Sequence, residues 1–530
     1  MTLHRGDREF RHPGVTHVDY KQVEMDRVLT AFLPRLWWGG APSVLARSAD
    51  LSVDDFVDTV HEHPRLFDGF ERDITRRWME THLLDLVNRG KSNQMVAGLR
   101  PLHGFTYRFR NSRRSRPAGV DEQLYAMIQH ASDGKGIEAL RYLKEFFFAG
   151  VDANTETPKL GAEIDVETQA LINLSEAVRK DITDRPAGGK DRKSHPSHPP
   201  LYPGASDLLV EDVVRLLFHK HLIPRSVLVD YLKILFAFHL ALYHLQIMKL
   251  LPARVKGEQS SPNGGFFLDV AGIPGTPAAQ LAERGASVWY GRIPEFVRAT
   301  FCLKKLDDFA WNLVKLNRLG KPPNGFFKVE DLVTLLGPAH SAERSRFGEV
   351  RMDRVLESSR TSEEEPDSAI ARIQELGLDP FTTYIDVITA YRVRFHRQYI
   401  TECLDSLLLK NRPGAMIAQP RRGGRRFVLD SRLLEVLLQI ALLRPGGSQG
   451  FHTAPLRVDH FLAILRDRYG LHIDRLPLGD GFGQTGITDQ AALRENVRAF
   501  TARLREIGFY SDMSDAYLTQ TITPRYVVPA

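Results

Sequence analysis

The run ILFAFHLALYHLQIM, residues 234–248, decides the fold class of this 530-residue chain. It contains no Asp, Glu, Lys or Arg, but it is shorter than the roughly 20 residues that a membrane-spanning helix needs. Asp230, Lys233 and Lys249 flank it. On a helical wheel Asp230, Lys233, Ala237 and His244 share one narrow stripe, and apolar groups occupy most of the remaining surface. We therefore expect the central helix of a large bundle rather than a membrane span.

The composition is that of an ordinary globular protein. Hydrophobic residues make up 43% and charged residues 26% of the chain, which argues against wholesale disorder. The length exceeds what a single core usually fills, so several domains are expected. The net charge of +6 permits binding to a polyanion without requiring it. Cys302 and Cys403 form no CxxC pair and the first residues lack an apolar signal segment, which predicts a cytoplasmic protein without disulfides.

Apolar residues at helical spacing recur along most of the chain. They predict a mainly α, multidomain protein with minor β structure and a winged-helix-like module at its C-terminal end. Stretches rich in proline and glycine, and one acidic stretch, mark the boundaries. We expect an N-terminal helical domain with a basic strand, a central helical domain, an acidic linker, a helical connector with a basic loop and a winged-helix-like domain, at residues 1–184, 207–337, 338–367, 368–427 and 428–530 respectively.

The C-terminal module has the clearest pattern. Helices that begin at Ser431, after Thr453 and near Asp489 each carry an apolar seam, and the run FYSDMSDAYLTQTIT (509–523) reads as two short strands around a turn. Three helices followed by a β-hairpin is the order of a winged helix. The third helix of such a module commonly enters the major groove of DNA.

Three arginines project from that third helix on one side. Arg494, Arg498 and Arg505 lie within about 40° of one another and about 120° from the apolar seam, by the advance of a helix per residue. They are expected to face outward, where they can contact phosphates or guanine edges. Glu495 and Glu506 share the exposed side, so a solvated helix face or a protein-binding surface remains an alternative.

A second basic segment lies between residues 100 and 117, with six arginines and no acid. Its aromatic residues alternate with polar ones over 105–110, which is the pattern of a half-buried strand. Arginines interleaved with aromatics suit a groove that follows a phosphate backbone. The alternative is that the aromatics face the core and the arginines face water or pair with acids. The residues for which we predict nucleic-acid contact are Arg108, Arg110, Arg113, Arg114 and Arg116.

The run QPRRGGRRF (419–427) forms a third basic segment. A flexible backbone with several guanidinium groups suits phosphate contacts by a mobile loop. A solvated linker between domains explains the same composition. The predicted contacts here are Arg421, Arg422, Arg425 and Arg426.

The sequence contains no complete catalytic motif, metal-ligand set or phosphate-binding loop, so we predict no cofactor and no bound metal. The GxGxxG run at 481–486 has no strand–helix–strand unit around it and is interpreted as a loop. Pairs such as His61 and His63 are spaced poorly for joint metal binding on one helix face. Asp269 follows a predicted strand, but no acid-x-Lys strand follows to complete a nuclease site.

Two runs carry a family resemblance. LREIGFYSDMSDAYLTQTITPRY (504–526) and HLIPRSVLVDYLKILFAFHLALYHLQIMKLLP (221–252) resemble accessory proteins of bacterial anti-phage defence systems, in particular subunits of methylation-associated defence operons. Accessory subunits of phosphorothioate-dependent restriction are functionally comparable. The resemblance implies a cytosolic component that works beside a separate methyltransferase, nuclease or ATPase, and it assigns no catalytic residue.

The leading hypothesis is a subunit of a multi-protein, restriction-like defence complex that has no chemistry of its own and binds DNA or acts as a scaffold. Its expected partners are DNA and other products of a defence operon. One alternative is a divergent metal-dependent nuclease whose site is assembled from dispersed acids such as Asp269. The other is a winged-helix transcriptional regulator, which predicts a homodimer and a symmetric operator.

Overall fold

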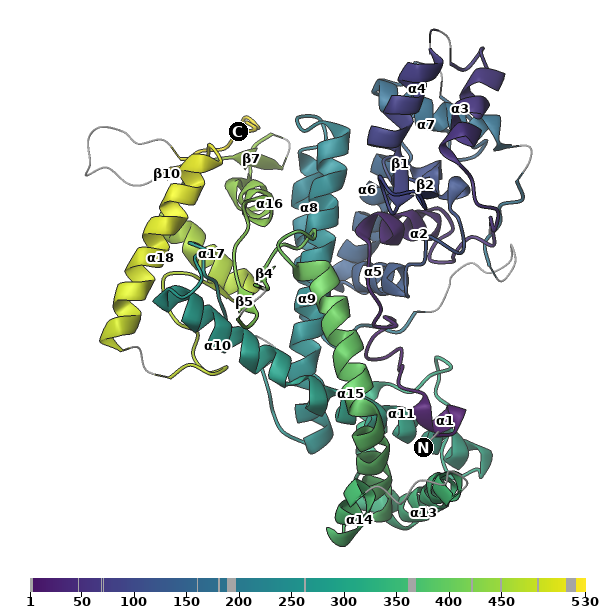
Figure 1. Cartoon of the computed structure of the whole chain (residues 1–530), viewed down its shortest axis with the longest axis vertical. Coiled ribbons are helices and arrows are strands. Elements are labelled where there is room, and N and C mark those ends of the chain that lie inside the picture. The colour runs from purple at the N-terminus through teal and green to yellow at the C-terminus, as the bar shows by residue number, and fades with distance from the viewer. Residues whose placement is uncertain are drawn as a thin grey trace.

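The structure is a computed structural model of the whole chain (Figure 1). The residues that it describes are 3–45, 47–67, 69, 71–159, 161–179, 182–187, 197–261, 264–360, 368–420, 423–448, 450–483, 486–510 and 521–530.

Helices dominate the fold. They hold 57% of the residues and strands hold 8%, which confirms the predicted mainly α class with minor β structure. Among the described residues the strands pair only two at a time, in five small sheets. Helix packing therefore builds the core, and the short strands join segments that are distant in sequence.

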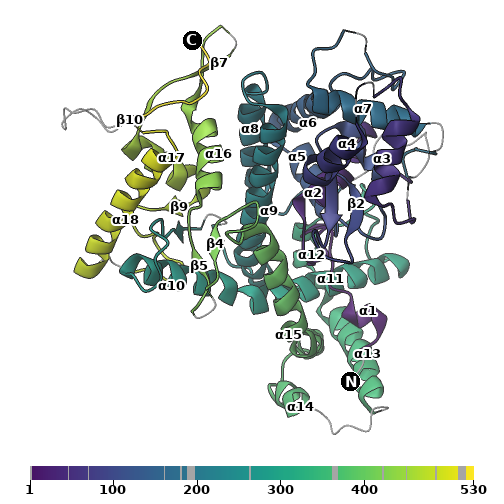
Figure 2. The same cartoon turned by 45° about the horizontal axis from the view of Figure 1, so that its top comes forward.

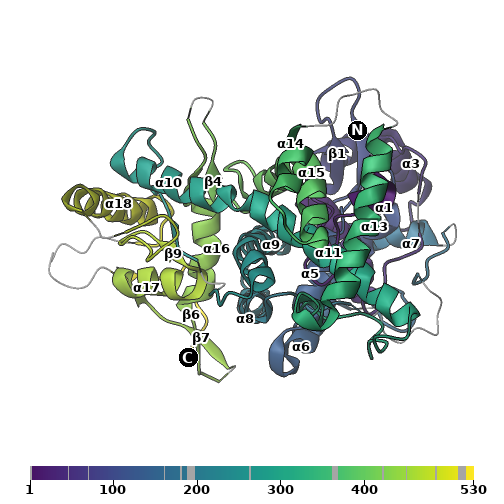
Figure 3. The same ribbon diagram turned by 90° about the horizontal axis from the view of Figure 1, so that it is seen from below.

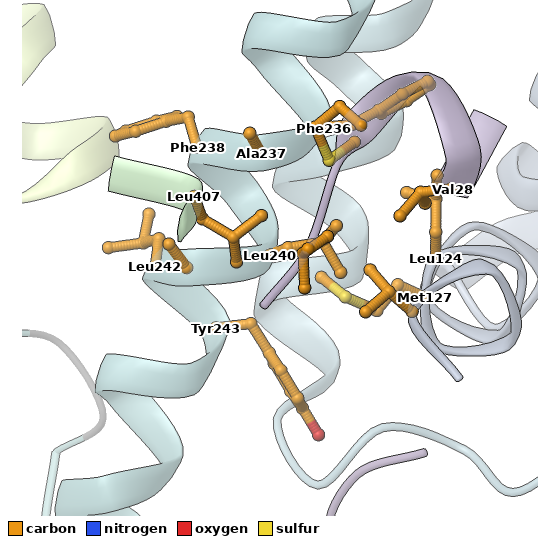
Figure 4. Close-up of a cluster of buried hydrophobic side chains, with 14 of the residues drawn as sticks. Val28, Leu124, Met127, Phe236, Ala237, Phe238, Leu240, Leu242, Tyr243 and Leu407 are labelled. Atoms are coloured by element: carbon orange, nitrogen blue, oxygen red, sulfur yellow. The ribbon is translucent and has the colours of Figure 1, made fainter. Parts of the chain in front are cut away.

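Helix α9 (Arg225–Lys256) is the centre of the molecule, as the sequence predicts. It is the one described helix that is long and apolar enough to cross a membrane, but 94% of its most apolar window is buried inside the protein. Pro224 precedes its first turn, and Gly257 ends it in the left-handed conformation. Figure 4 shows Phe236 and Leu240 of α9 among side chains from other helices. The long apolar run is thus the core helix of a bundle.

Three long helices surround α9. Helix α8 precedes it and α11 and α15 pack along it, so that α9 stands between the N-terminal and C-terminal parts of the chain in Figures 1 and 2. Helix α10 leads from the C-terminal part towards α11. The bounds of these elements are α8 Pro203–Phe218, α10 Pro277–Gly291, α11 Ile293–Lys315 and α15 Pro380–Leu408.

The N-terminal part is a group of shorter helices with one β-hairpin, which packs on α8 and α9 mainly through α2, α5 and α6. Strands β1 and β2 pair antiparallel with one irregularity in register. The elements are α1 Arg5–Arg8, α2 Met25–Trp37, α3 Val53–Glu62, α4 Arg72–Trp78, the π-helical turn η1 Met79–Leu83, β1 Leu84–Val87, β2 Met95–Leu99, α5 Val120–Gln129, η3 Ser132–Gly134, α6 Lys135–Phe147 and α7 Val166–Ala177.

The strand predicted over 105–110 is wrong. Residues Gly104–Phe109 form the 3-10 helix η2, and all six are buried. A half-buried strand requires one face in water, but here the aromatic residues and the polar residues between them both face the interior. The predicted alternation therefore reflects two kinds of buried contact rather than an inside and an outside.

The stretch 338–367, expected to be an acidic linker, contains helical structure instead. The short turn η5 (Pro338–His340) leads into α13 (Ser341–Arg360), which packs on α15. Met352 and Val355 are buried there, and this spacing of three residues supplies the apolar side that holds the helix. Residues 361–367, which carry the acidic run, lie outside the described residues. Helices α12 (Val329–Thr334) and α14 (Ser368–Glu375) complete this region.

The C-terminal part contains the three helices predicted for it. Their bounds are α16 Ser431–Leu442, α17 Val458–Tyr469 and α18 Ile487–Glu506. Short strands lie between and around them, namely β3 Phe266–Phe267, β4 Ile417–Ala418, β5 Arg426–Phe427, β6 Leu443–Pro445, β7 Phe451–Thr453, β8 Leu456–Arg457, β9 Leu471–His472 and β10 Thr521–Ile522.

Two strand pairs of the C-terminal part join segments that are distant in sequence. Strand β10 pairs antiparallel with β8, and Tyr510 forms an antiparallel bridge with Ile522 of β10. Most of the predicted hairpin, residues 511–520, lies outside the described residues. Strand β3 pairs parallel with β9, so a segment from before α10 is built into the C-terminal part. One cluster of buried hydrophobic side chains runs from Leu3 to Ile522; the division into five domains stays a prediction.

Candidate nucleic-acid interface

Helix α18 presents the predicted arginine face to solvent. Its apolar seam, which includes Phe500 and Leu504, is buried, and the helix lies at the outer edge of the molecule, away from α8 and α9 (Figure 1). Arg494, Arg498 and Arg505 are all exposed. The structure therefore places these three predicted residues together on one helix surface.

A buried amide fixes how α18 sits. The Nδ2 atom of Asn496 donates to the carbonyl oxygens of Leu268 and Ile473, at 2.9 and 3.0 Å, and its Oδ1 atom accepts from the backbone nitrogen of Val270 at 2.9 Å. A buried polar group with all of its partners satisfied specifies a single arrangement. The exposed face of α18 is held in a fixed direction as a result.

Two arginines of this face have no acidic ion-pair partner among the described residues. Among the residues that the structure describes, neither Arg494 nor Arg498 forms an ion pair, whereas Arg505 lies with its guanidinium 5.1 Å from the ring centre of Tyr510. Glu506 is paired with Arg503 at 3.2 Å, so it does not neutralise them. Glu495 is exposed on the same side and reduces the net charge of the face by one.

The segment of residues 104–116 is not a continuous arginine strip. Arg108 is buried, with its Nη2 atom 2.6 Å from Glu156 and its guanidinium 3.8 Å from the ring centre of Phe105. Arg110 is half-buried and donates to the carbonyl oxygen of Leu45 at 3.4 Å, and burial lowers its pKa. The guanidinium of Arg108 is therefore committed to contacts in the interior, and that of Arg110 is only partly open to solvent.

The other three arginines of this segment lie nearer the surface. Arg114 pairs with Asp50 at 3.3 Å, and both side chains are 37% exposed. Arg113 and Arg116 are exposed. The nucleic-acid contact predicted for this segment remains a prediction, and Arg113, Arg114 and Arg116 are its members nearest the surface.

In the third basic segment, residues 419–427, the two arginines that the structure describes are both paired with acids. Arg421 and Arg422 lie outside the described residues. Arg425 pairs with Asp405 through two contacts of 3.0 and 2.5 Å, and this hydrogen bonding raises its pKa. Arg426 is buried against Asp269, with Nε 3.1 Å from Oδ2. Arg426 therefore forms a buried ion pair beside β3. The glycine-rich sequence pattern around it did not indicate this structural role.

One basic surface was missed in the sequence. The run YRVRFHRQY (391–399) on α15 places Arg394 and Arg397 on the surface, where both are exposed. With Gln398 and Thr401 they recur at the i, i+3, i+4, i+7 spacing of one helix face. That spacing is the signal that would have found them, but the buried residues of the same helix masked it.

The candidate acid for a nuclease site is already occupied. The carboxylate of Asp269 faces Arg426 and accepts from the backbone nitrogen of Gly272 at 2.9 Å. Burial raises its pKa, against the opposing effect of these partners. No group of three or more His, Cys, Asp or Glu residues in the described part of the chain is placed to hold a metal ion.

Together the fold and this surface define a mainly helical protein with exposed arginines on a C-terminal helix. The chain belongs to the family of methylation-associated defense system protein MAD7, whose family model matches residues 5–526. It is therefore a component of a methylation-associated defence system, which confirms the resemblance drawn from the two quoted runs. Searches of the curated proteins and of the solved structures give no match.

Proposed function

We propose that this chain binds duplex DNA through the arginine face of α18 and presents it to other subunits of the defence system, without chemistry of its own. The observation that carries the proposal is that Arg494 and Arg498 are exposed on a rigidly held helix and have no ion-pair partner among the described residues. Arginine in such a position gains more from a phosphate than from water, because binding releases condensed counterions from the DNA.

The order of elements supports a winged-helix reading of the C-terminal part. Strand β8 lies between α16 and α17, and β10, which follows α18, pairs with it. Tyr510 bridges to Ile522 on the other side of β10. A winged helix has this arrangement of one strand before the second helix and two after the third, with the third helix as the usual reader of the groove.

Membership of a defence system suggests other operon products as partners, and we propose that one of them supplies any methyltransferase, nuclease or ATPase activity. Cys302 and Cys403 are buried free thiols, which fits a reducing compartment such as the bacterial cytoplasm.

The test is DNA binding by fluorescence anisotropy across a salt series, with a 24-base-pair duplex. The variant Arg494→Ala/Arg498→Ala removes both charges, and alanine keeps the helix. We expect binding that weakens steeply with salt. In the variant we expect an affinity about tenfold lower and a slope of log K against log salt that is smaller by about 1.8, because each phosphate contact contributes about 0.9.

The matched control removes the same charge elsewhere. Arg65 and Arg77 are also exposed, and they belong to the N-terminal part, remote from α18 (Figure 1). The variant Arg65→Ala/Arg77→Ala should bind like the wild type. Equal losses in the two variants would mean that only net charge matters, and an absence of binding at low salt would leave a protein scaffold as the function.

A further inference from the structure

Helix α15 carries a second donor-rich face beside a surface groove. Arg394, Arg397, Gln398 and Thr401 line a hollow of about 410 Å³ together with Tyr290, Glu402 and Arg425. Tyr290 is the penultimate residue of α10, and Arg425 lies beside β5, so three segments that are distant in sequence form the walls.

The groove has a positive balance of charge. Arg394 and Arg397 have no ion-pair partner in the described part of the chain, and Arg425 keeps 30% of its side chain exposed while it is paired with Asp405. The one acid of the lining, Glu402, accepts from the Nε2 atom of Gln398 at 2.9 Å. Two guanidinium groups are thus left with free donors on the solvent side, which is the chemistry that recognises phosphate oxygens.

An exposed aromatic ring borders the same face. Phe395 is 43% exposed, and the guanidinium of Arg392 lies 4.1 Å from its ring centre. Apolar rings next to free arginines are typical of surfaces that follow a nucleic-acid backbone. Nothing of this kind is needed for the fold of α15, whose buried residues face α9, α11 and α13.

Helix α10 connects this groove to the buried side of α18, whose outer side carries the exposed arginines. The first half of α10, at Ala278 and Ala282, is buried in one cluster with Leu493 of α18. Its last turn forms a wall of the groove at Tyr290. Eight to twelve residues of helix separate these points, or about 12 to 18 Å at 1.5 Å per residue. All three views place α10 between α18 and α15, most clearly from below in Figure 3.

We propose that the α15 groove is a second contact for the DNA backbone, so that one duplex is held at α18 and at α15 together. The inference rests on the proposed function, which supplies the ligand. The stretch of α10 between its contact with α18 and Tyr290 is as long as about four or five base pairs at 3.4 Å each, so both helices lie within the length of a short duplex. Two linked contacts of this kind strengthen binding beyond either one, because the second forms within the complex already held by the first.

The first experiment uses the same anisotropy assay with Arg394→Ala/Arg397→Ala. We expect an affinity for the 24-base-pair duplex about tenfold lower and a salt slope smaller by about 1.8. The combination of these changes with Arg494→Ala/Arg498→Ala should lower the slope by about twice that amount. The control Arg65→Ala/Arg77→Ala again binds like the wild type.

A local probe distinguishes the groove from the rest of the surface. The chain's own cysteines are buried, so Gln398→Cys, which is exposed, accepts an environment-sensitive dye selectively. Ser92→Cys, on the exposed turn between β1 and β2, is the matched control. Addition of the duplex should change the emission of the dye at position 398 and leave the dye at position 92 unchanged.

The outcomes separate the two proposals. A wild type that does not bind duplex overturns the proposed function, and this inference falls with it. Wild-type binding that Arg494→Ala/Arg498→Ala weakens, but that Arg394→Ala/Arg397→Ala leaves intact with no signal at position 398, overturns the α15 contact alone.

Discussion

His239 and Asp212 form a pair in the interior, with the Nε2 atom of the imidazole 3.0 Å from the Oδ2 atom of the carboxylate and both side chains buried. The same carboxylate accepts from the hydroxyl of Tyr469 at 2.8 Å and from the Nη2 atom of Arg468 at 2.5 Å. Burial alone would raise the pKa of Asp212, but these partners outweigh it, and its pKa lies below the usual range. One carboxylate therefore joins α8, α9 and α17.

Replacement of Asp212 by alanine should strongly destabilise the protein. Arg468 would keep its contact with Glu211 but lose the one with Asp212. The substitution would also leave a cavity in the interior beside the guanidinium. Breaking a buried ion pair by removing one partner costs about 3 to 5 kcal/mol. The measurement is the free energy of unfolding in urea.

The control for that experiment is Asp467→Ala. Asp467 is the next residue to Arg468, but its side chain is 71% exposed and pairs with Arg466 at 3.3 Å. Exposed pairs contribute about 0 to 1 kcal/mol, so this variant should unfold almost like the wild type. Similar losses in the two variants would show that the carboxylate of Asp212 does not clamp the three helices.

Stability should fall as the pH drops from about 6.5 to about 4. Burial lowers the pKa of His244 to about 4, against the opposing hydrogen bond to the carbonyl oxygen of Leu240, and lowers the pKa of His12 and of His103 to about 3. In this window the unfolded chain binds protons that the folded chain does not. Each such histidine then costs about 1.4 kcal/mol of unfolding free energy per pH unit.

The variant His244→Gln tests this dependence. Glutamine offers hydrogen-bonding groups to Thr16, which lies 3.1 Å from the Nε2 atom of His244, but it does not titrate. We expect the plot of unfolding free energy against pH to be less steep by about one proton between pH 6 and pH 4.5. A variant with the wild-type slope would assign the acid sensitivity to other groups.

Two glycines that end helices should differ sharply in their tolerance of alanine. Gly470 ends α17 and Gly257 ends α9, both in the left-handed conformation, with φ of 71° and 74°. A Cβ atom at Gly470 would lie 2.1 Å from the carbonyl oxygen of Gly264, whereas at Gly257 it would meet nothing within 4 Å.

The backbone conformation alone costs an alanine about 1 to 2 kcal/mol, which is the whole effect expected for Gly257→Ala. Gly470→Ala should cost at least about 3 kcal/mol more, because the paired strands β3 and β9 must move apart. Differential scanning calorimetry of the two variants measures the difference. Equal melting temperatures would show that β3 and β9 can shift at little cost in free energy to accommodate the added methyl group.

The central helix was predictable because its apolar run exceeds what a surface helix tolerates. Pro224 and Gly257 also mark its ends in the sequence, so α9 follows from local chemistry. The 3-10 helix η2 does not follow from local chemistry. The buried Arg108 is paired with Glu156 and Asp184, which are 48 and 76 positions away. Spacing within a segment does not contain such partners.

Only the part of the candidate interface that depends on local sequence could be predicted. The exposure of Arg494 and Arg498 follows from the seam of their own helix, which is local. The burial of Arg426 depends on Asp269, and the free state of Arg394 depends on which acids lie near α15. Both are set by tertiary packing, so composition alone assigned similar roles to arginines that the structure separates.

The hydrogen bond from Asn496 to Leu268 joins residues 228 positions apart, and this distance has a consequence for synthesis. A ribosome that adds about 5 to 20 residues per second would release the β3 segment about 10 to 50 s before its partner on α18 exists. During that interval α10 can cover part of β3, but the contact of Phe267 with the cluster that contains Leu493 of α18 is still missing. Such late closure exposes a nascent chain to aggregation, and a cell that makes this protein has good reason to keep a chaperone close to the ribosome.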